Sequence, residues 1–241
     1  MSRLCIETRG AASWRERLAS PDTQWRRHYS AFETAVSWEL ASSSTAGLPE
    51  PILALFRDTT FDNPELLFAI AEHKVPLPGG RTDSQCDVWA LLDTTTGLVS
   101  MSVEAKASEP FGQNNESLAQ WLVAEKSDKS HKNRETRWEY IKDHLPNSAT
   151  DGYSQVAYQL LHRCATAVIE ARRLRLPNAA FVVQAFESPK ESFEAFSRFC
   201  QAMGLRAERG RMQMTVVGNV HLGVGWADCP FATDEQLASL F

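Results

Sequence analysis

Two acidic residues and one lysine stand out as candidates for chemistry: Asp87, Glu104 and Lys106. Two carboxylates on neighbouring strands, with Cβ atoms about 5 Å apart, are close enough for one divalent cation to bridge them. Carboxylate oxygens are hard ligands that suit Mg²⁺ or Mn²⁺. A lysine on the same face would offset negative charge on a bound phosphate. If the fold brings the three residues together, they predict a metal-dependent site that hydrolyses phosphodiester bonds.

A β-hairpin is the element that would bring them together. Residues 85–93 and 98–106 are rich in strand-forming types, and the short polar segment TTTG separates them. If the two runs pair symmetrically around this turn, Asp87 lies opposite Glu104, and Lys106 points to the same face. Every residue on the other face is apolar, which fixes the register against a slip of one residue. These residues are Val88, Ala90, Leu92, Val99, Met101, Val103 and Ala105.

A third acid, Glu72, precedes the hairpin. Asn63 is a good N-cap and Pro64 suits the first turn of a helix, so the sequence predicts a short helix over residues 63–73. On this interpretation Glu72 lies at the end of the helix that faces the hairpin, and Glu65 lies at the far end. Glu72 is therefore the better candidate for supporting a second metal ion or orienting a water molecule.

Further polar residues lie on the longest helical pattern, residues 153–174. Gln159, His162 and Arg163 are three and four positions apart, so they share one face of the predicted helix. These side chains could contact the phosphate that is cleaved, or its neighbours. In the alternative, structural interpretation, His162 donates to a nearby carboxylate and Arg163 forms a surface ion pair.

Asp87, followed after a strand turn by Glu104-Ala105-Lys106, resembles the Asp…Glu-x-Lys signature of the PD-(D/E)XK superfamily of restriction-endonuclease-like enzymes. The predicted order of helix, three strands, helix and strand also resembles the core of that superfamily, with residues 75–77 as a short first strand. Wider strings resemble a small uncharacterised bacterial family of nuclease-like proteins. These strings are residues 72–74, 76–80, 109–112 and 158–163.

The resemblance implies an α/β fold with a restriction-endonuclease-like core (α-β-β-β-α-β) around a central mixed sheet. That core would occupy residues 63–187. Residues 1–62 would form an N-terminal helical extension, and residues 188–241 would add a C-terminal helix and strands packed on the core.

The resemblance also implies a nuclease that depends on Mg²⁺ or Mn²⁺, with DNA as the favoured nucleic-acid substrate. Asp87, Glu104 and Glu72 would hold the metal, and Lys106 would position the attacking water. Residues on the helix after the hairpin would bind substrate. These are Tyr158, Gln159, His162 and Arg163. A homodimer would allow both strands to be cut, and restriction, phage defence and repair are all compatible with such an activity.

The charge distribution fits a nuclease better than the net charge does. The net charge of −5 disfavours an unspecialised nucleic-acid binder. However, residues 59–119 carry 3 Lys and Arg against 9 Asp and Glu, whereas residues 120–175 carry 10 against 7. An acidic segment that could hold a cation thus precedes a basic one that could hold a polyanion. Trp121 and Trp138 in the basic segment are candidates for contact with nucleic acid, whereas Trp14, Trp25 and Trp38 are expected in the core.

Cysteine spacing and hydropathy indicate the cellular compartment. The five cysteines, Cys5, Cys86, Cys164, Cys200 and Cys229, are widely spaced and form no Cys-x-x-Cys pair for zinc or redox chemistry. No apolar run is long enough to span a bilayer, and the first ten residues do not have the pattern of a signal peptide. We therefore expect a cytoplasmic protein with reduced thiols and no membrane association.

Two other functions are compatible with the sequence. In a catalytically inactive nuclease fold, the carboxylates would pair with Lys74, Arg81 or Lys106, and the protein would bind nucleic acid or a protein partner. A hydrolase that uses Cys86 or a serine as nucleophile is disfavoured, because the sequence contains neither a Gly-x-Ser-x-Gly elbow nor a Walker-type phosphate loop.

Overall fold

A six-stranded sheet lies at the centre of the computed structural model, which describes residues 9–112, 114–124, 127–147 and 152–240. The strands are β1 (Glu65–Val75), β2 (Ser84–Asp93), β3 (Val99–Lys106), β4 (Asn178–Phe186), β5 (Met212–Val217) and β6 (Val220–Cys229). Their order across the sheet is β1-β2-β3-β4-β6-β5. Strands β1 to β3 are antiparallel, β3, β4 and β6 run parallel, and β5 returns antiparallel to β6. The fold is therefore α/β with a mixed open sheet.

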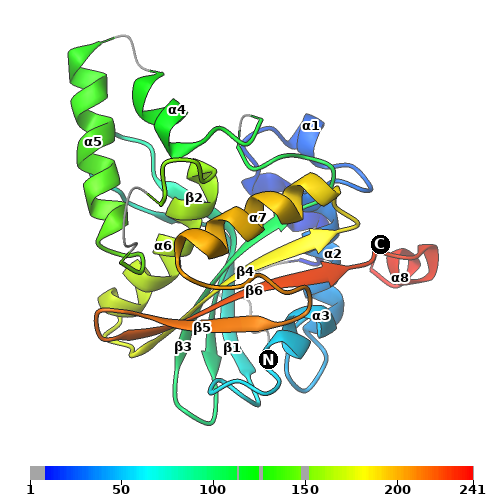
Figure 1. The fold of residues 1–241 in the computed structure, drawn as a ribbon. Helices are drawn as coiled ribbons and strands as arrows, with labels where there is room; N and C mark the ends of the chain where they lie inside the picture. The colour runs from blue at the N-terminus through cyan, green and yellow to red at the C-terminus, as the bar shows by residue number, and fades with distance from the viewer. Residues whose placement is uncertain (1–8, 113, 125–126, 148–151, 241) are drawn as a thin grey trace.

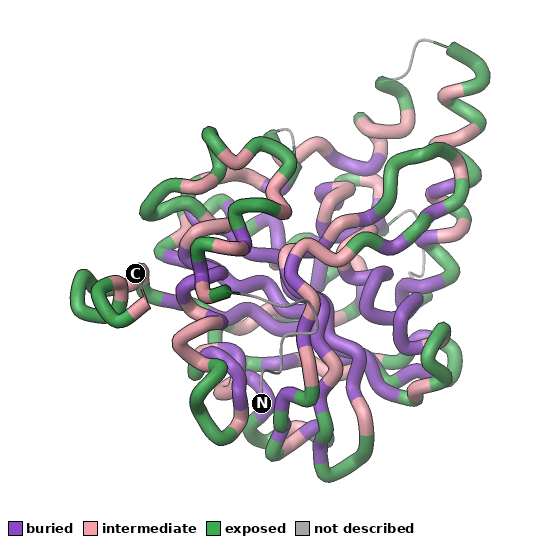
Figure 2. Tube along the Cα trace, turned by 180° about the vertical axis from the view of Figure 1, so that it is seen from behind, coloured by how far each residue is buried: buried purple, intermediate pink, exposed green. Residues whose placement is uncertain are grey.

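Helices cover both faces of the sheet and make three layers (Figure 1). Helices α2 (Ser30–Ala41) and α3 (Glu50–Leu55) pack on one face, and α6 (Tyr158–Arg173) and α7 (Lys190–Ala202) pack on the other. Each face has its own apolar core, and β3 and β4 between them are buried along their whole length. Figure 2 shows this buried centre, with exposed residues gathered on the loops and the outer helices.

The remaining helices lie at the periphery. A 3-10 helix (Ala11–Arg17) and α1 (Pro21–Gln24) precede α2, and α8 (Asp234–Ala238) projects beyond the end of β6 (Figure 1). Helices α4 (Leu118–Val123) and α5 (Asp128–Lys142) are inserted between β3 and α6 and extend past one corner of the sheet. None of the helices in the described part of the chain combines the length and the apolar character that a membrane crossing requires.

The predicted hairpin register is confirmed. Val88 pairs with Val103, Ala90 with Met101, and Leu92 with Val99. These side chains lie in the core under α2 and α3, as the apolar alternation predicts. Trp89 lies on the other face, where its indole Nε1 donates to Ser100 Oγ at 3.0 Å. The polar face of the hairpin thus points toward α6.

The predicted helix over residues 63–73 is wrong. This segment forms strand β1, Glu65–Val75, which pairs antiparallel with β2, so the first strand is not the short segment 75–77. Asn63 has a positive φ of 49° and lies in the turn before the strand. The residues ELLFAIAEHKV have ordinary helix propensity, but pairing with β2 and burial of alternate apolar side chains outweigh that preference. The helix before the first strand is therefore α3.

Candidate metal and phosphate site

Three carboxylates lie side by side across β1, β2 and β3. On the β1–β2 ladder, Ala71 pairs with Val88 and His73 pairs with Cys86. Glu72 and Asp87 therefore lie opposite each other between these two pairs. The β2–β3 ladder ends at the pair Val88–Val103, and Asp87 and Glu104 are the residues next to this pair on the two strands. Asp87 Oδ2 accepts a hydrogen bond from the Ala105 backbone N–H at 2.6 Å. Asp87 and Glu104 therefore meet as the sequence predicts, and Glu72 joins them from a strand instead of a helix.

Glu104, the carboxylate on β3, is paired with two cations. Its Oε1 accepts from Lys106 Nζ at 2.8 Å, and its Oε2 accepts from Arg163 Nε at 2.7 Å. Its side chain is only 2% exposed and that of Lys106 is 7% exposed. Burial alone would raise the pKa of Glu104, but the two cations outweigh burial and hold the pKa below its ordinary value. Glu104 is therefore ionised at neutral pH.

The pKa values of Asp87 and Glu72 are shifted in the opposite direction, upward. Burial, and then the charges of Glu104 and Glu72, raise the pKa of Asp87 well above its ordinary value. Burial also raises the pKa of Glu72 to about 7, although Gln85 Nε2 donates a hydrogen bond to its Oε2. Both shifts arise because anions are crowded where water is largely excluded.

The backbone of Glu72 is strained. Its φ is 55°, in the left-handed region that a residue with a side chain rarely adopts. Such a conformation in a strand costs on the order of 1 kcal/mol and is found where the surrounding structure fixes a side chain in place. The bend puts the carboxylate near enough to Glu104 and Arg163 for their charges to affect its pKa.

The donor set suits a hard divalent cation in its chemistry. Lys74, Lys106 and Arg163 supply three positive charges around the three carboxylates. Their oxygens are the ligands that Mg²⁺ and Mn²⁺ prefer, and Mg²⁺ commonly completes its shell with water. Within the described residues, no three His, Cys, Asp or Glu side chains are already arranged as a ligand set. A cation would therefore have to draw Asp87 and Glu72 inward, or compete with Arg163 for Glu104.

Helix α6 supplies Arg163 and positions the other residues expected to bind substrate. Arg163 forms a buried ion pair with Glu104, not the surface pair of the structural alternative. His162 Nδ1 lies 2.8 Å from Ser84 Oγ and contacts this hydroxyl instead of a carboxylate. Gln159 Oε1 accepts from the Gly112 backbone N–H. The aromatic ring of Tyr158 stacks on Trp121, with 3.7 Å between ring centroids. Of these four residues, Arg163 alone directly contacts a carboxylate of the central group.

Sequence reasoning did not single out Ser84 and Gln85, which both contact the site. Ser84 Oγ accepts from Arg163 NH1 at 3.3 Å and lies 3.0 Å from Thr166 Oγ1. Gln85 binds Glu72, as described above. Their position two and three residues before Asp87, on the same strand, is the one signal that could have indicated them.

A cavity of ≈ 440 Å³ opens beside this group, between the loop before β2, helix α5 and the start of α6. We call it the α5 pocket. Its lining includes Ser84, Ser130, Arg134, Arg137, Tyr158 and His162. Ser84 and His162 at its floor are hydrogen-bonded to each other, and Arg163 links Ser84 to Glu104. The pocket and the carboxylates are thus joined through one guanidinium group.

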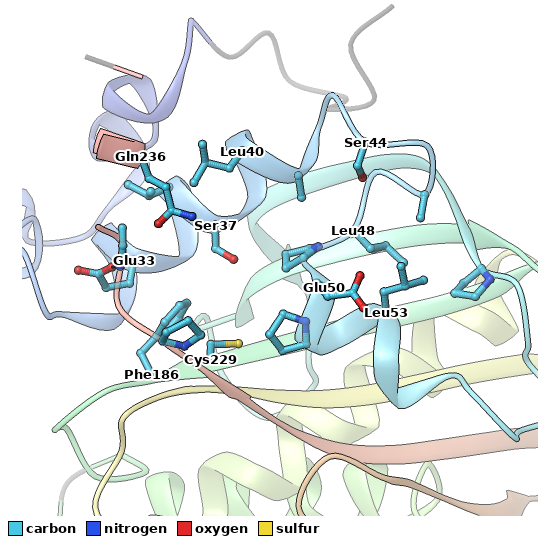
Figure 3. Close-up of a pocket in the computed structure, with 18 of the residues that line it drawn as sticks. Glu33, Ser37, Leu40, Ser44, Leu48, Glu50, Leu53, Phe186, Cys229 and Gln236 are labelled. Atoms are coloured by element: carbon cyan, nitrogen blue, oxygen red, sulfur yellow. Dashed lines mark hydrogen bonds between the residues drawn. The ribbon is translucent and has the colours of Figure 1, made fainter. Parts of the chain in front are cut away.

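A second cavity, of ≈ 920 Å³, lies on the other side of the sheet between α2, α3 and the segment after β6 (Figure 3). Its lining is mainly apolar, with three carboxylates, Glu33, Glu50 and Glu65, and no lysine, arginine or histidine among the described lining residues. Glu33 accepts from the backbone N–H groups of His28 and Ala232 at 2.8 and 2.9 Å, so it serves to join the two segments. This cavity is separated from Asp87 and Glu104 by the sheet.

The aromatic residues and the cysteines have structural contacts. Trp14 and Trp38 are buried and Trp25 is partly buried against them, as predicted. Trp121 stacks on Tyr158 and carries the Arg134 guanidinium 4.8 Å from its ring centroid, so other groups already contact its ring. Trp138 packs edge-on against Tyr153. The four described cysteines are free and buried, while Cys5 lies outside the described residues. Burial raises the pKa of the Cys86 thiol, which disfavours its use as a nucleophile.

Comparison with known proteins gives a family. Residues 7–230 match a family described as a domain of unknown function, DUF6946. The chain belongs to the DUF6946 family. No curated protein and no solved structure matches the chain. For this member of DUF6946, function therefore has to be argued from the site itself.

Proposed function

We propose that this DUF6946 protein is a metal-dependent nuclease with a restriction-endonuclease-like core. The observation that carries the proposal is the meeting of Asp87 and Glu104 across two strands, with Lys106 2.8 Å from Glu104. The order of α3, β1, β2, β3, α6 and β4 supports it, because this is the order of helix, three strands, helix and strand in that superfamily. The raised pKa values of Asp87 and Glu72, which arise from burial and then from the neighbouring carboxylates, are a second support.

Each residue has a role in such a reaction. Asp87 and Glu104 would hold Mg²⁺ or Mn²⁺, with Glu72 as an additional carboxylate. When bound, the cation would polarise a phosphate oxygen and lower the pKa of the attacking water. Lys106, held by Glu104, would orient that water and offset negative charge on the phosphate. Arg163 keeps Glu104 ionised. It lies on α6, which covers the face of the sheet where the substrate would bind.

A cleavage assay tests the proposal directly. Single- and double-stranded DNA and RNA would be incubated with the protein in Mg²⁺, Mn²⁺ or a chelator. We expect metal-dependent cleavage, with a loss on the order of a hundredfold or more in Asp87→Asn and Lys106→Ala. Asp93→Asn, which removes an exposed carboxylate at the other end of β2, is the matched control and should retain activity. Cleavage that persists in chelator, or that survives Asp87→Asn, would refute the assignment.

A catalytically inactive binding module is the second candidate, and one observation favours it. Both oxygens of Glu104 are already paired with the protein's own cations. A retired active site would keep such pairs for stability. Calorimetric titration with Mn²⁺ separates the two candidates, because the nuclease should bind the ion and lose binding in Asp87→Ala. Identical titrations of wild type and variant would favour the module.

A further inference from the structure

The α5 pocket has positive charge on one wall. Arg134 and Arg137 lie three residues apart on α5, so their side chains share one side of the helix. Arg137 is fixed in place, because it donates to the carbonyls of Pro78 at 3.2 Å and Thr82 at 2.7 Å. Asp83 is the only acid among the described residues of the lining. It is exposed, whereas Arg137 is buried.

The floor of the pocket is also in a positive field. Burial, and then the charges of Arg163, Arg137 and Lys106, hold the pKa of His162 well below its ordinary value. His162 is therefore neutral at pH 7. Lys106 and Arg163 are both paired with Glu104, whereas Arg137 lines the pocket itself, where Asp83 is the one acid among the described lining residues. A group with negative charge would be favoured here.

The aromatic lining disfavours a base as the occupant. Base stacking needs an open ring face. Trp121 has Tyr158 stacked on it and the Arg134 guanidinium over its ring, and Tyr158 also lies 4.9 Å from the His162 ring. These contacts join Arg134, Trp121, Tyr158 and His162 along one side of the pocket. The side chains of Ser130 and Asn133 on the lining are suited to hydrogen bonds with oxygens, whereas the Ser84 hydroxyl is already bonded to His162, Thr166 and Arg163.

We propose that the α5 pocket binds the terminal phosphate monoester of a nucleic-acid strand, and so places the end of that strand beside Asp87 and Glu104. A monoester carries more negative charge than the diester groups inside a strand, because its second pKa is about 6. Two arginines in a pocket closed by a loop and two helices therefore favour a strand end over a continuous strand. This inference rests on the proposed nuclease function, and it names the substrate class.

Nucleotide binding tests the pocket without any cleavage. Adenosine 5′-monophosphate, adenosine 3′-monophosphate and adenosine would be titrated calorimetrically into the metal-free protein. We expect a monophosphate to bind and adenosine not to bind. Whether the 5′- or the 3′-monophosphate binds more tightly identifies which strand end the pocket takes.

Two pocket variants and one control make the test specific. Ser130→Asp puts a negative charge on the lining, and it lies in the first turn of α5, where an acid is compatible with the helix. Arg134→Gln removes one cation. Each should weaken monophosphate binding about tenfold or more. Lys132→Gln removes an exposed cation of the same helix outside the pocket lining and should leave binding unchanged. Monophosphate binding that Ser130→Asp does not weaken would overturn the proposal.

Cleavage of matched oligonucleotides separates this inference from the proposed function. Strands would carry a 5′-phosphate, a 3′-phosphate or hydroxyls at both ends. We expect the wild type to prefer one phosphorylated end and Ser130→Asp to lose the preference. Equal cleavage of all three strands would refute the pocket while leaving the nuclease intact. Monophosphate binding without cleavage of any strand would support the pocket and refute the nuclease.

Discussion

Replacing Glu72 by glutamine should stabilise the metal-free protein at pH 8. Burial, and then the charge of Glu104, raise the pKa of the Glu72 carboxylate from an ordinary 4.5 to about 7. Between these two values the unfolded chain has released the proton that the folded chain retains. The stability of the wild type therefore falls as the pH rises from 4.5 through 7, and the variant lacks this loss.

The size of the effect follows from the shift. A rise from 4.5 to about 7 corresponds to about 3.5 kcal/mol at about 1.4 kcal/mol per pH unit. Glu72 is only partly buried, so solvent screening reduces the expected gain to about 1 to 2 kcal/mol. For a chain of this length that gain raises Tm by about 2 to 8 °C at pH 8. Below pH 4.5 the two proteins should have nearly equal Tm values.

Thermal unfolding in chelator, followed by circular dichroism from pH 4 to pH 9, measures the gain. Glu65→Gln removes an exposed carboxylate at the far end of β1 and is the matched control. Its Tm at pH 8 should not exceed that of the wild type. With saturating Mn²⁺ the order should reverse, because the ion stabilises the wild type more than Glu72→Gln. If Glu72→Gln is less stable than the wild type in chelator at pH 8, the three carboxylates are not crowded as described.

Three further predictions concern packing, charge and protons. Gly79→Ala should destabilise the protein by more than about 2 kcal/mol, because a Cβ there would lie 2.0 Å from a backbone oxygen of α5. Gly210→Ala, which has a similar positive φ and nothing within 4 Å, should cost about 1 kcal/mol. Equal costs of the two variants in urea unfolding would contradict the contact. Arg163→Met should lower the free energy of unfolding by about 3 kcal/mol at pH 7, since it leaves the buried carboxylate of Glu104 with one cation fewer. A loss below about 1 kcal/mol would show that the ion pair is not buried. The apparent affinity for Mn²⁺ should rise with pH up to and beyond about 7, because Glu72 must lose its proton to bind the ion. The rise should be at most about tenfold per pH unit for each proton released. An affinity that is independent of pH between 6 and 8 would exclude Glu72 as a ligand.

The hairpin could be predicted from the sequence because its two faces differ. The apolar run on one face and the carboxylates on the other allow a single register, and the observed pairs, such as Val88 with Val103, agree with it. Helix α6 and strand β4 were predictable for a related reason, since both are long apolar patterns bounded by Pro177. In each case the residue pattern indicates which face of the element is buried.

Strand β1 could not be predicted because its sequence carries little strand signal. Its alanines, leucines and glutamates favour a helix in isolation, and the pairing with β2 that decides its structure is a tertiary interaction. The same limit applies to Arg163. Its helical face was predictable, but its ion pair with Glu104 depends on how α6 crosses the sheet. In the α5 pocket, Arg137 lies 59 and 55 positions in sequence from its partners Pro78 and Thr82, so no local pattern connects them.

Arg163 couples the two parts of the site. Its Nε donates to Glu104 at 2.7 Å and its NH1 donates to Ser84 at 3.3 Å on the floor of the α5 pocket. A divalent cation at Glu104 would repel the guanidinium, and a phosphate in the pocket would attract it. We therefore expect metal and nucleotide to bind with positive cooperativity, each raising the affinity for the other by the same factor, about fivefold or more.

The coupling can be measured as the affinity for adenosine monophosphate at several free Mn²⁺ concentrations, corrected for metal bound by the nucleotide itself. Arg163→Lys is the informative variant, because a single ammonium can pair with Glu104 but lacks the planar fork that contacts Ser84 at the same time. It should retain weak binding of both ligands and lose their cooperativity. If wild type and Arg163→Lys bind the nucleotide equally well with and without Mn²⁺, the carboxylates and the pocket are independent sites, and the guanidinium serves only to hold β3 against α6.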